Sequence, residues 1–272
     1  MIRLADLNQS STQTNSSSSI SLTAIIDTAL CVGAGGSSGS LSDKPILKNA
    51  EGKLVIPASQ LKGRLRHECE KIARALGWDI CESPVAQTMC PQRAGLTGNF
   101  EHDHYDVGDR NPDDSTRHHC LICQLFGNPS LPSRLQFSDL VCTEHPDNIP
   151  EVLRPGVTIN RRRCTAEEGK LFFLETSPAN TALRFKGTIH IQPRWKLTHQ
   201  TDEESRTTDF AKALMLAGLK HIHALGGSKS TGLGWLHWEP SVFRDPQIND
   251  HVWAFLSSPP PHIKKEVNHE AN

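Results

Sequence analysis

The stretch that decides the fold is Ile56–Gly77, which reads IPASQLKGRLRHECEKIARALG. Pro57 breaks the extended stretch before it, and Ser59 is a suitable residue to cap a following helix. Gly77 is a typical helix end. Between these signals the apolar residues recur at helical spacing on one face, with basic residues opposite, including Lys62, Arg66 and Arg74. The stretch therefore predicts an amphipathic helix entered directly from a strand.

The flanking sequence supplies the remaining elements of a small sandwich. Alternating or clustered apolar residues predict strands at 20–32, 135–141 and 183–191 and a last strand ending near 238. Apolar residues at helical spacing predict the helix above and a second helix at 208–222. The order strand, helix, strand, strand, helix, strand is that of a ferredoxin-like (RRM-like) α+β fold. We expect an antiparallel sheet with two helices on one face.

Two segments lie outside this simple pattern. Residues 157–175 read as two strands around a charged turn near 167–169, which predicts a protruding, thumb-like hairpin over about 155–176. Residues 79–127 hold four cysteines in polar sequence and predict an insertion that needs a metal to order it. We expect a disordered leader at 1–19, one domain at 20–240 and a loosely attached tail at 241–272.

The bulk composition excludes some classes of function. The chain has 272 residues and a net charge of −1, so attraction to nucleic acid has to be local. No segment has the roughly 20 apolar residues of a membrane span, and the N-terminus lacks a secretory signal, so we expect a cytoplasmic protein without a membrane partner. Basic residues cluster at Lys62 to His67, at Arg161 to Arg163, and at Arg184 with Lys186.

The insertion carries a metal-binding pattern. Cys120 and Cys123 are separated by two residues, a spacing that brings two thiolates to one tetrahedral ion, and Cys90 lies upstream. The fourth ligand is open between Cys81 and a histidine, of which His119 is the nearest in sequence. We interpret the set as a structural Zn²⁺ site. The alternative is a group of buried thiols beside surface histidines.

Two further segments have the composition of phosphate contacts. The expected helix carries Lys62, Arg64 and Arg66 near its start, where backbone N–H groups also favour anions, although a solvated basic face explains the same residues. The segment Gly226–Gly234 reads GGSKSTGLG, and its Gly226, Gly227 and Lys229 would allow close approach of a phosphodiester. It is not a P-loop, because Ser228 stands where the motif needs glycine, and a tight turn is the alternative.

These pieces, in this order, resemble the RAMP superfamily, specifically the repeated backbone subunit of type III CRISPR effector complexes. The matching stretches are the glycine loop at 33–36, DKPILK from Asp43, IPASQLKGRLR from Ile56, CLICQLFG from Cys120, VTINRRRCTAEEGKLFFLE from Val157 and GGSKSTGLGW from Gly226. The sequence departs from the common pattern at Ala58, where the family often has glycine, and in the histidine-rich stretch between Cys90 and Cys120.

The resemblance implies the function and several site residues. Such subunits stack along a guide RNA within a multi-subunit complex, bind single-stranded target RNA through the guide, and some cut the target with a loop aspartate and Mg²⁺ or another divalent metal. By alignment that aspartate is Asp43, which from the sequence alone is an ordinary loop residue. Arg161, Arg162 and Arg163 then contact guide or target RNA, and Lys62 to Arg66 meet guide phosphates.

Three other functions remain open at this point. The chain is a non-catalytic RNA-binding scaffold of the same complex if Asp43 does not cut. It is a metal-independent, guide-processing endoribonuclease if His221 and His223 act as general acid and base. It is an unrelated zinc-dependent RNA-binding module if the cysteine-rich insertion itself forms the RNA surface.

Overall fold

The structure is a computed structural model, and it describes residues 18–33, 42–78, 80–85, 88–90, 120–129, 131–191, 210–244 and 250–257. Most of the expected leader, the glycines Gly35 and Gly36, and the tail from residue 258 lie outside these ranges. None of the described helices is long and apolar enough to cross a membrane.

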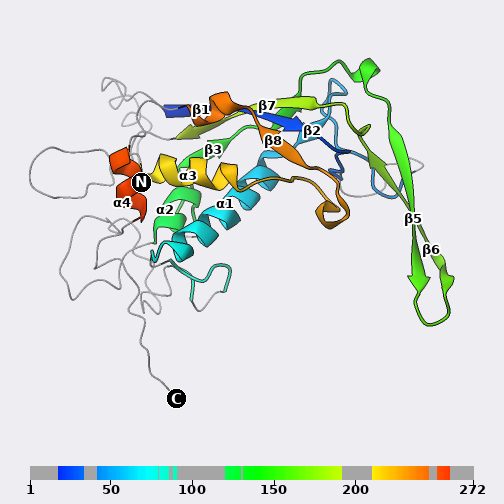
Figure 1. Ribbon diagram of the computed structural model, residues 1–272, viewed down its shortest axis with the longest axis horizontal. Helices are drawn as coiled ribbons and strands as arrows, with labels where there is room; N and C mark the ends of the chain where they lie inside the picture. Colours follow the sequence, from blue (N-terminus) through cyan, green and yellow to red (C-terminus); the bar gives the residue numbers. More distant parts are fainter. Residues whose placement is uncertain are drawn as a thin grey trace, which may run out of the picture.

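The centre of the molecule is an antiparallel sheet in the order β2-β4-β7-β1-β8, with β3 also paired to β7 (Figure 1). Strands β3 and β4 both pair with β7 and act as two halves of one strand. The four main strands then lie in the order β3/β4, β7, β1, β8, which is the order of the ferredoxin-like fold. The register of β1 on β7 runs from Ser18↔Ile191 to Ile26↔Leu183. The strands are β1 (Ser18–Ile26), β2 (Val55–Ile56), β3 (Leu135–Phe137), β4 (Leu140–Cys142), β7 (Leu183–Ile191) and β8 (Leu236–Trp238).

The helices cover one face of this sheet (Figure 1). They are α1 (Ala58–Ala75), α2 (Leu121–Phe126), α3 (Phe210–Lys220) and α4 (Asp250–Ser257), with single 3-10 turns at Pro146–Asn148, Lys229–Thr231 and Pro240–Phe243. Helices α1 and α3 approach closely at Gly218, where a Cβ atom would lie 2.8 Å from both Cys69 Sγ and the Leu65 side chain. The core between helices and sheet contains the fully buried Leu22, Leu61 and Phe185 among many apolar residues.

The mixed α+β class with antiparallel sheets agrees with the sequence, but two element boundaries and one helix cap differ. Strand β1 ends at Ile26 and not near Val32, because residues 27–33 leave the sheet and bond to loops on either side. Helix α1 begins after Pro57, and Ser59 lies inside its first turn without capping it. The N–H of Ala58 donates instead to Asp139 Oδ1, at 2.7 Å, so the cap comes from the turn between β3 and β4.

The segment after residue 240 is partly packed, which corrects the expectation of a loosely attached tail. Val242 in the Pro240–Phe243 turn, and Val252 and Leu256 in α4, are buried in the main core. The indole N–H of Trp78 donates to Leu256 O at 2.9 Å, which ties α4 to the end of α1.

The expected hairpin is present as a separate two-stranded sheet of β5 (Val152–Asn160) and β6 (Thr165–Thr176) that projects from the body (Figure 1). Its turn is at 161–164 and not at 167–169, so the arginines, and not the glutamates, form the tip. The charged residues near 167–169 predicted the wrong turn position, because Glu167 and Gly169 lie within β6. They face the part of β5 where the pairing register shifts between Val157 and Ile159.

Candidate metal centre and nucleic-acid interface

The four cysteines of the insertion converge below the end of α1. Cys81 follows that helix, Cys120 is the N-cap of α2, and Cys123 lies in the first turn of α2. The Sγ atoms of these three and of Cys90 all lie within 4.8 Å of one another, and all four residues are buried. Sγ of Cys81 is 3.5 Å from Sγ of Cys123 and 3.6 Å from Sγ of Cys120.

This arrangement fits a tetrahedral metal ion. Zn–S bonds of about 2.3 Å place neighbouring sulfurs of a tetrahedron roughly 3.8 Å apart, close to the observed separations. Hydrogen bonds from the thiols of Cys120 and Cys123 lower the pKa of Cys81, while the same neighbours raise the pKa of Cys90. Without a cation the four thiols cannot all ionise in one buried cluster. The cluster can hold a metal such as zinc.

The structure brings Cys81 into the position that the sequence left open. Cys81 contacts both Cys120 and Cys123, and the backbone N–H of Cys120 donates to Cys90 Sγ at 3.3 Å. The alternative ligand His119 lies outside the described residues.

Arg66 connects helix α1 to this cluster. Its guanidinium donates to Glu70 Oε1 at 3.0 Å, Gly127 O at 2.9 Å and Ser83 Oγ at 3.1 Å. Burial acts to lower its pKa, but the bond to Glu70 and the nearby cysteines raise it overall. Its side chain is 23% exposed, which corrects the expectation that it lies on the open face of the helix.

The other basic residues at the start of α1 have fewer inward contacts. Arg64 pairs with Glu68 at 2.9 Å, and Lys71 reaches the same carboxylate at 2.9 Å. Burial, and then the charge of Arg66, lower the pKa of Lys62. Because the Asp139 carboxylate already binds the first N–H of the helix, an RNA phosphate would meet the side chains here and not the bare helix terminus.

Asp43 lies at the base of the hairpin. Its Oδ2 accepts the backbone N–H of Phe173 in β6 at 2.7 Å, and its own N–H donates to Phe173 O at 3.1 Å. The side chain is exposed, and its second carboxylate oxygen accepts no hydrogen bond from another described residue. The carboxylate is therefore held in place and still accessible to a metal ion or RNA.

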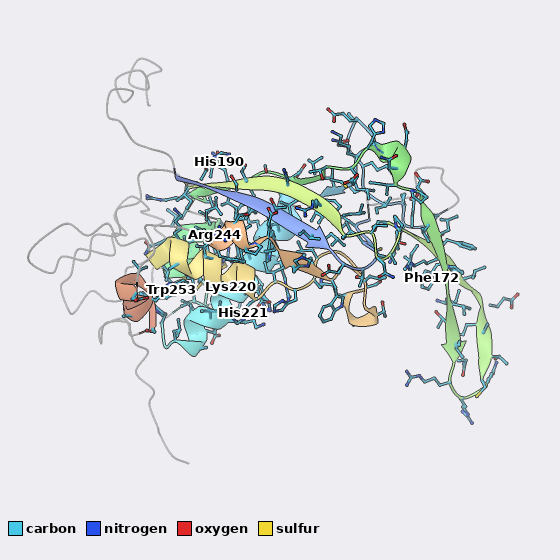
Figure 2. All side chains as sticks on the ribbon, turned by 45° about the horizontal axis from the view of Figure 1, so that its top comes forward. Phe172, His190, Lys220, His221, Arg244 and Trp253 are labelled. Atoms are coloured by element: carbon cyan, nitrogen blue, oxygen red, sulfur yellow. The ribbon has the colours of Figure 1, made fainter. Side chains whose placement is uncertain are left out.

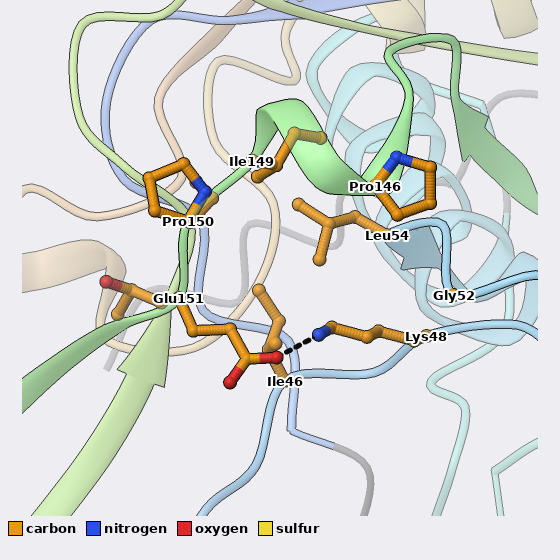
Figure 3. Close-up of a pocket in the computed structure, with 10 residues that line it drawn as sticks. Ile46, Lys48, Gly52, Leu54, Pro146, Ile149, Pro150 and Glu151 are labelled. Carbon is orange, nitrogen blue, oxygen red and sulfur yellow. Dashed lines mark hydrogen bonds and ion pairs between the residues drawn. The ribbon is translucent and has the colours of Figure 1, made fainter.

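A buried acid fastens the segment that carries Asp43. Glu175 is 7% exposed, and its Oε2 accepts the N–H of Ile46 at 2.9 Å and lies 3.5 Å from Ser42 Oγ. Close by, a small hollow contains the ion pair of Lys48 with Glu151, which lowers the pKa of Glu151 (Figure 3). These contacts fix both flanks of Asp43 to the root of the hairpin.

The glycine loop packs at the same end of the sheet. Gly227 donates to Cys31 O at 2.6 Å, and Gly234 donates to Ala29 O at 2.8 Å. Gly234 has a φ of +71°, and a Cβ there would lie 1.8 Å from Leu225 O, so no side chain fits. Lys229 Nζ donates to Gly226 O at 3.1 Å within the loop itself. The loop is a tight turn whose outer face is exposed.

The hairpin tip and the histidine pair are both at the surface. Arg161, Arg162 and Arg163 are exposed, and the N–H groups of Arg162 and Arg163 donate to Asn160 Oδ1 at 3.1 and 3.2 Å. Figure 2 shows the tip far from the helical layer. His221 and His223 follow α3 and are exposed, and no hydrogen bond of the described residues joins either of them to Asp43.

Sequence reasoning missed two residues that position this end of the molecule. Glu175 follows the apolar run LFFL, and an acid at the end of such a run is the signal that could have identified a buried carboxylate. The role of Asp139 leaves no comparable signal, because it acts on a helix 81 positions away in sequence.

Comparisons with known proteins agree with this architecture. The model of the RAMP superfamily matches residues 23–237, which include most of the sheet, the cysteine cluster, the hairpin and the glycine loop. A search of the curated proteins finds no match. The chain belongs to the RAMP superfamily.

Proposed function

We propose that this chain is a guide-RNA-binding backbone subunit of a type III CRISPR interference complex, and that it cleaves target RNA at the guide–target duplex. Membership of the RAMP superfamily supports a CRISPR-associated RNA-binding role. The observation that carries the finer proposal is the attachment of Asp43 to the root of the projecting hairpin through Phe173. A hairpin that displaces one nucleotide of a duplex would present the distorted phosphodiester to that carboxylate.

The chemistry we propose needs a divalent metal from solution. A carboxylate that keeps one oxygen free can hold Mg²⁺ together with water and RNA oxygens, since Mg²⁺ keeps several such ligands. The metal would supply charge stabilisation of the cleaved phosphate. Asp43 itself would place the ion, and the bond from Phe173 N–H would keep the carboxylate aimed toward the hairpin.

One observation favours a non-catalytic scaffold as the second candidate. Among the described residues, the cysteine cluster is the only group of three or more potential metal ligands, so Asp43 belongs to no such group. A scaffold subunit would keep the same RNA contacts while another subunit cuts the target.

The test is target-RNA cleavage by the assembled, guide-loaded complex containing native chain, Asp43→Ala or Asp43→Asn. Asparagine retains an oxygen that can accept the Phe173 N–H but removes the charge. We expect both variants to lose at least about 100-fold in cleavage rate while target binding is unchanged. Mg²⁺ should be omitted, and not stripped by a strong chelator, because a chelator would also attack the cysteine site. Cuts that persist in both variants would identify a scaffold.

A further inference from the structure

The exposed indole of Trp235 has a rigid and unusual setting. Trp235 is 50% exposed, whereas its neighbours Leu233 and Leu236 are buried. Because side chains alternate along a strand, the inward position of Leu236 at the start of β8 directs Trp235 to the opposite face, away from the helices. A large apolar side chain is thus presented to solvent immediately after the glycine loop.

The backbone of Trp235 is held on both sides. Its N–H donates to Thr28 Oγ1 at 2.9 Å, its carbonyl accepts the N–H of Asp27 at 2.8 Å, and it forms an isolated bridge with Ala224. An aromatic side chain on a fixed backbone loses little entropy when it stacks on a ligand.

The surroundings of Trp235 are polar and do not resemble a protein-docking patch. The contacts above are to a hydroxyl and to backbone groups, and His237, two residues along β8, pairs with Asp27 at 3.0 Å. Gly232 and Gly234 lie beside it, and Lys229 belongs to the same loop. None of the other large exposed apolar residues of the described chain belongs to this loop or to β8.

The position of this loop also connects it to the proposed RNA path. Residues 27–33 bond to the glycine loop on one side, through Ala29 and Cys31, and to the hairpin root on the other, where Leu30 N–H donates to Ser177 Oγ at 2.9 Å. Trp235 therefore lies at the same end of the sheet as the segment that carries Asp43.

We propose that Trp235 is a stacking platform for one unpaired or splayed nucleobase of the bound RNA, with the glycine loop admitting the adjoining phosphodiester. Exposed aromatic side chains beside a backbone-binding surface are the general means by which proteins hold single-stranded RNA without reading its sequence. The inference rests on the proposed RNA-binding function and adds a base contact to it.

The test uses the full-length protein and a fluorescein-labelled, unstructured 20-nucleotide RNA, with binding followed by anisotropy. The variants are Trp235→Ala and Trp235→Phe, and Trp253→Ala is the control because Trp253 is another exposed tryptophan, 37% exposed, on α4. A second RNA has the same backbone length with abasic sites in place of its bases. Circular dichroism confirms that each variant is folded.

We expect Trp235→Ala to weaken binding of the normal RNA by about fivefold or more, Trp235→Phe to restore most of the affinity, and Trp253→Ala to have no effect. The abasic RNA should bind native chain and Trp235→Ala equally. If the native chain binds the RNA and the folded Trp235→Ala variant binds it with the same affinity, the stacking role is wrong but the proposed function stands. If that variant instead loses self-association, the indole makes a protein contact. Failure of the native chain to bind any RNA overturns the proposed function as well.

Discussion

At the scale of single residues, the cysteines divide into three chemical groups. Seven of the eight are buried, and only Cys164, at the hairpin tip, is exposed. Burial raises the pKa of Cys31, Cys69 and Cys142, which makes these thiols poor nucleophiles. The remaining four are the cluster described above.

This division predicts the labelling of the native protein by a maleimide. With metal bound, Cys164 should react first and one label per chain should be added quickly, because the cluster thiolates are engaged and the other three thiols are neutral and buried. Removal of the metal should expose four more reactive thiols and make the insertion sensitive to protease.

The matched control is Cys164→Ser, which should remove the fast label and leave metal content unchanged. Metal analysis should find one zinc per chain in this variant and none in Cys120→Ser with Cys123→Ser. A native protein without zinc, or cluster thiols that react as fast as Cys164 with metal present, would contradict the metal site.

Individual residues also show what the sequence could and could not predict. The Cys120 and Cys123 pair was predictable because the ligand spacing is local, and Cys81 remained ambiguous because its contact spans 42 positions of chain. Arg66 was expected on the solvent-exposed face of its helix, and no local pattern indicated that its side chain would bind Ser83 and Gly127.

At the scale of elements, the hairpin is the part of the molecule least supported by the core. Its strands pair only with each other along most of their length, and its apolar side chains Leu153, Val157, Ile159 and Leu171 are between 46% and 59% exposed. An isolated hairpin is only marginally stable in water. We therefore expect a ligand or a neighbouring subunit to cover the exposed apolar side chains of this hairpin.

The arginine tip should contribute to RNA binding through charge. Replacing Arg161, Arg162 and Arg163 together by alanine is expected to weaken RNA binding and to reduce the slope of log affinity against log salt by up to roughly 2, at about 0.7 for each phosphate that is no longer neutralised. The measurement is a salt titration of RNA binding. The triple lysine variant, which keeps the charge, should retain most of the slope, and an alanine variant with an unchanged slope would place the RNA elsewhere.

The elements themselves were largely predictable, and their ends were not. Helical spacing in α1 and alternation in β7 are properties of the local sequence, which is why both were identified. The cap of α1 by Asp139 and the turn at 161–164 depend on tertiary contacts and on a register shift, and the charged turn signal at 167–169 competed with the correct position.

At the scale of the whole molecule, three separate loops meet at one end of the sheet. The segment at 42–46, the glycine loop and the root of the hairpin are joined through residues 27–33 and through Glu175. The four cysteines of the cluster make none of the hydrogen bonds that join these segments. The molecule thus separates the candidate metal site from the proposed RNA site.

A backbone subunit of the kind we propose binds in several copies along one guide RNA, and native mass spectrometry of the complex purified with its RNA measures this directly. We predict a particle that contains more than one copy of the chain for each RNA molecule, with a copy number that rises when the guide is lengthened. A single copy bound at one end of the RNA, as a guide-processing enzyme would be, or a particle that contains no RNA, would contradict the proposed backbone role.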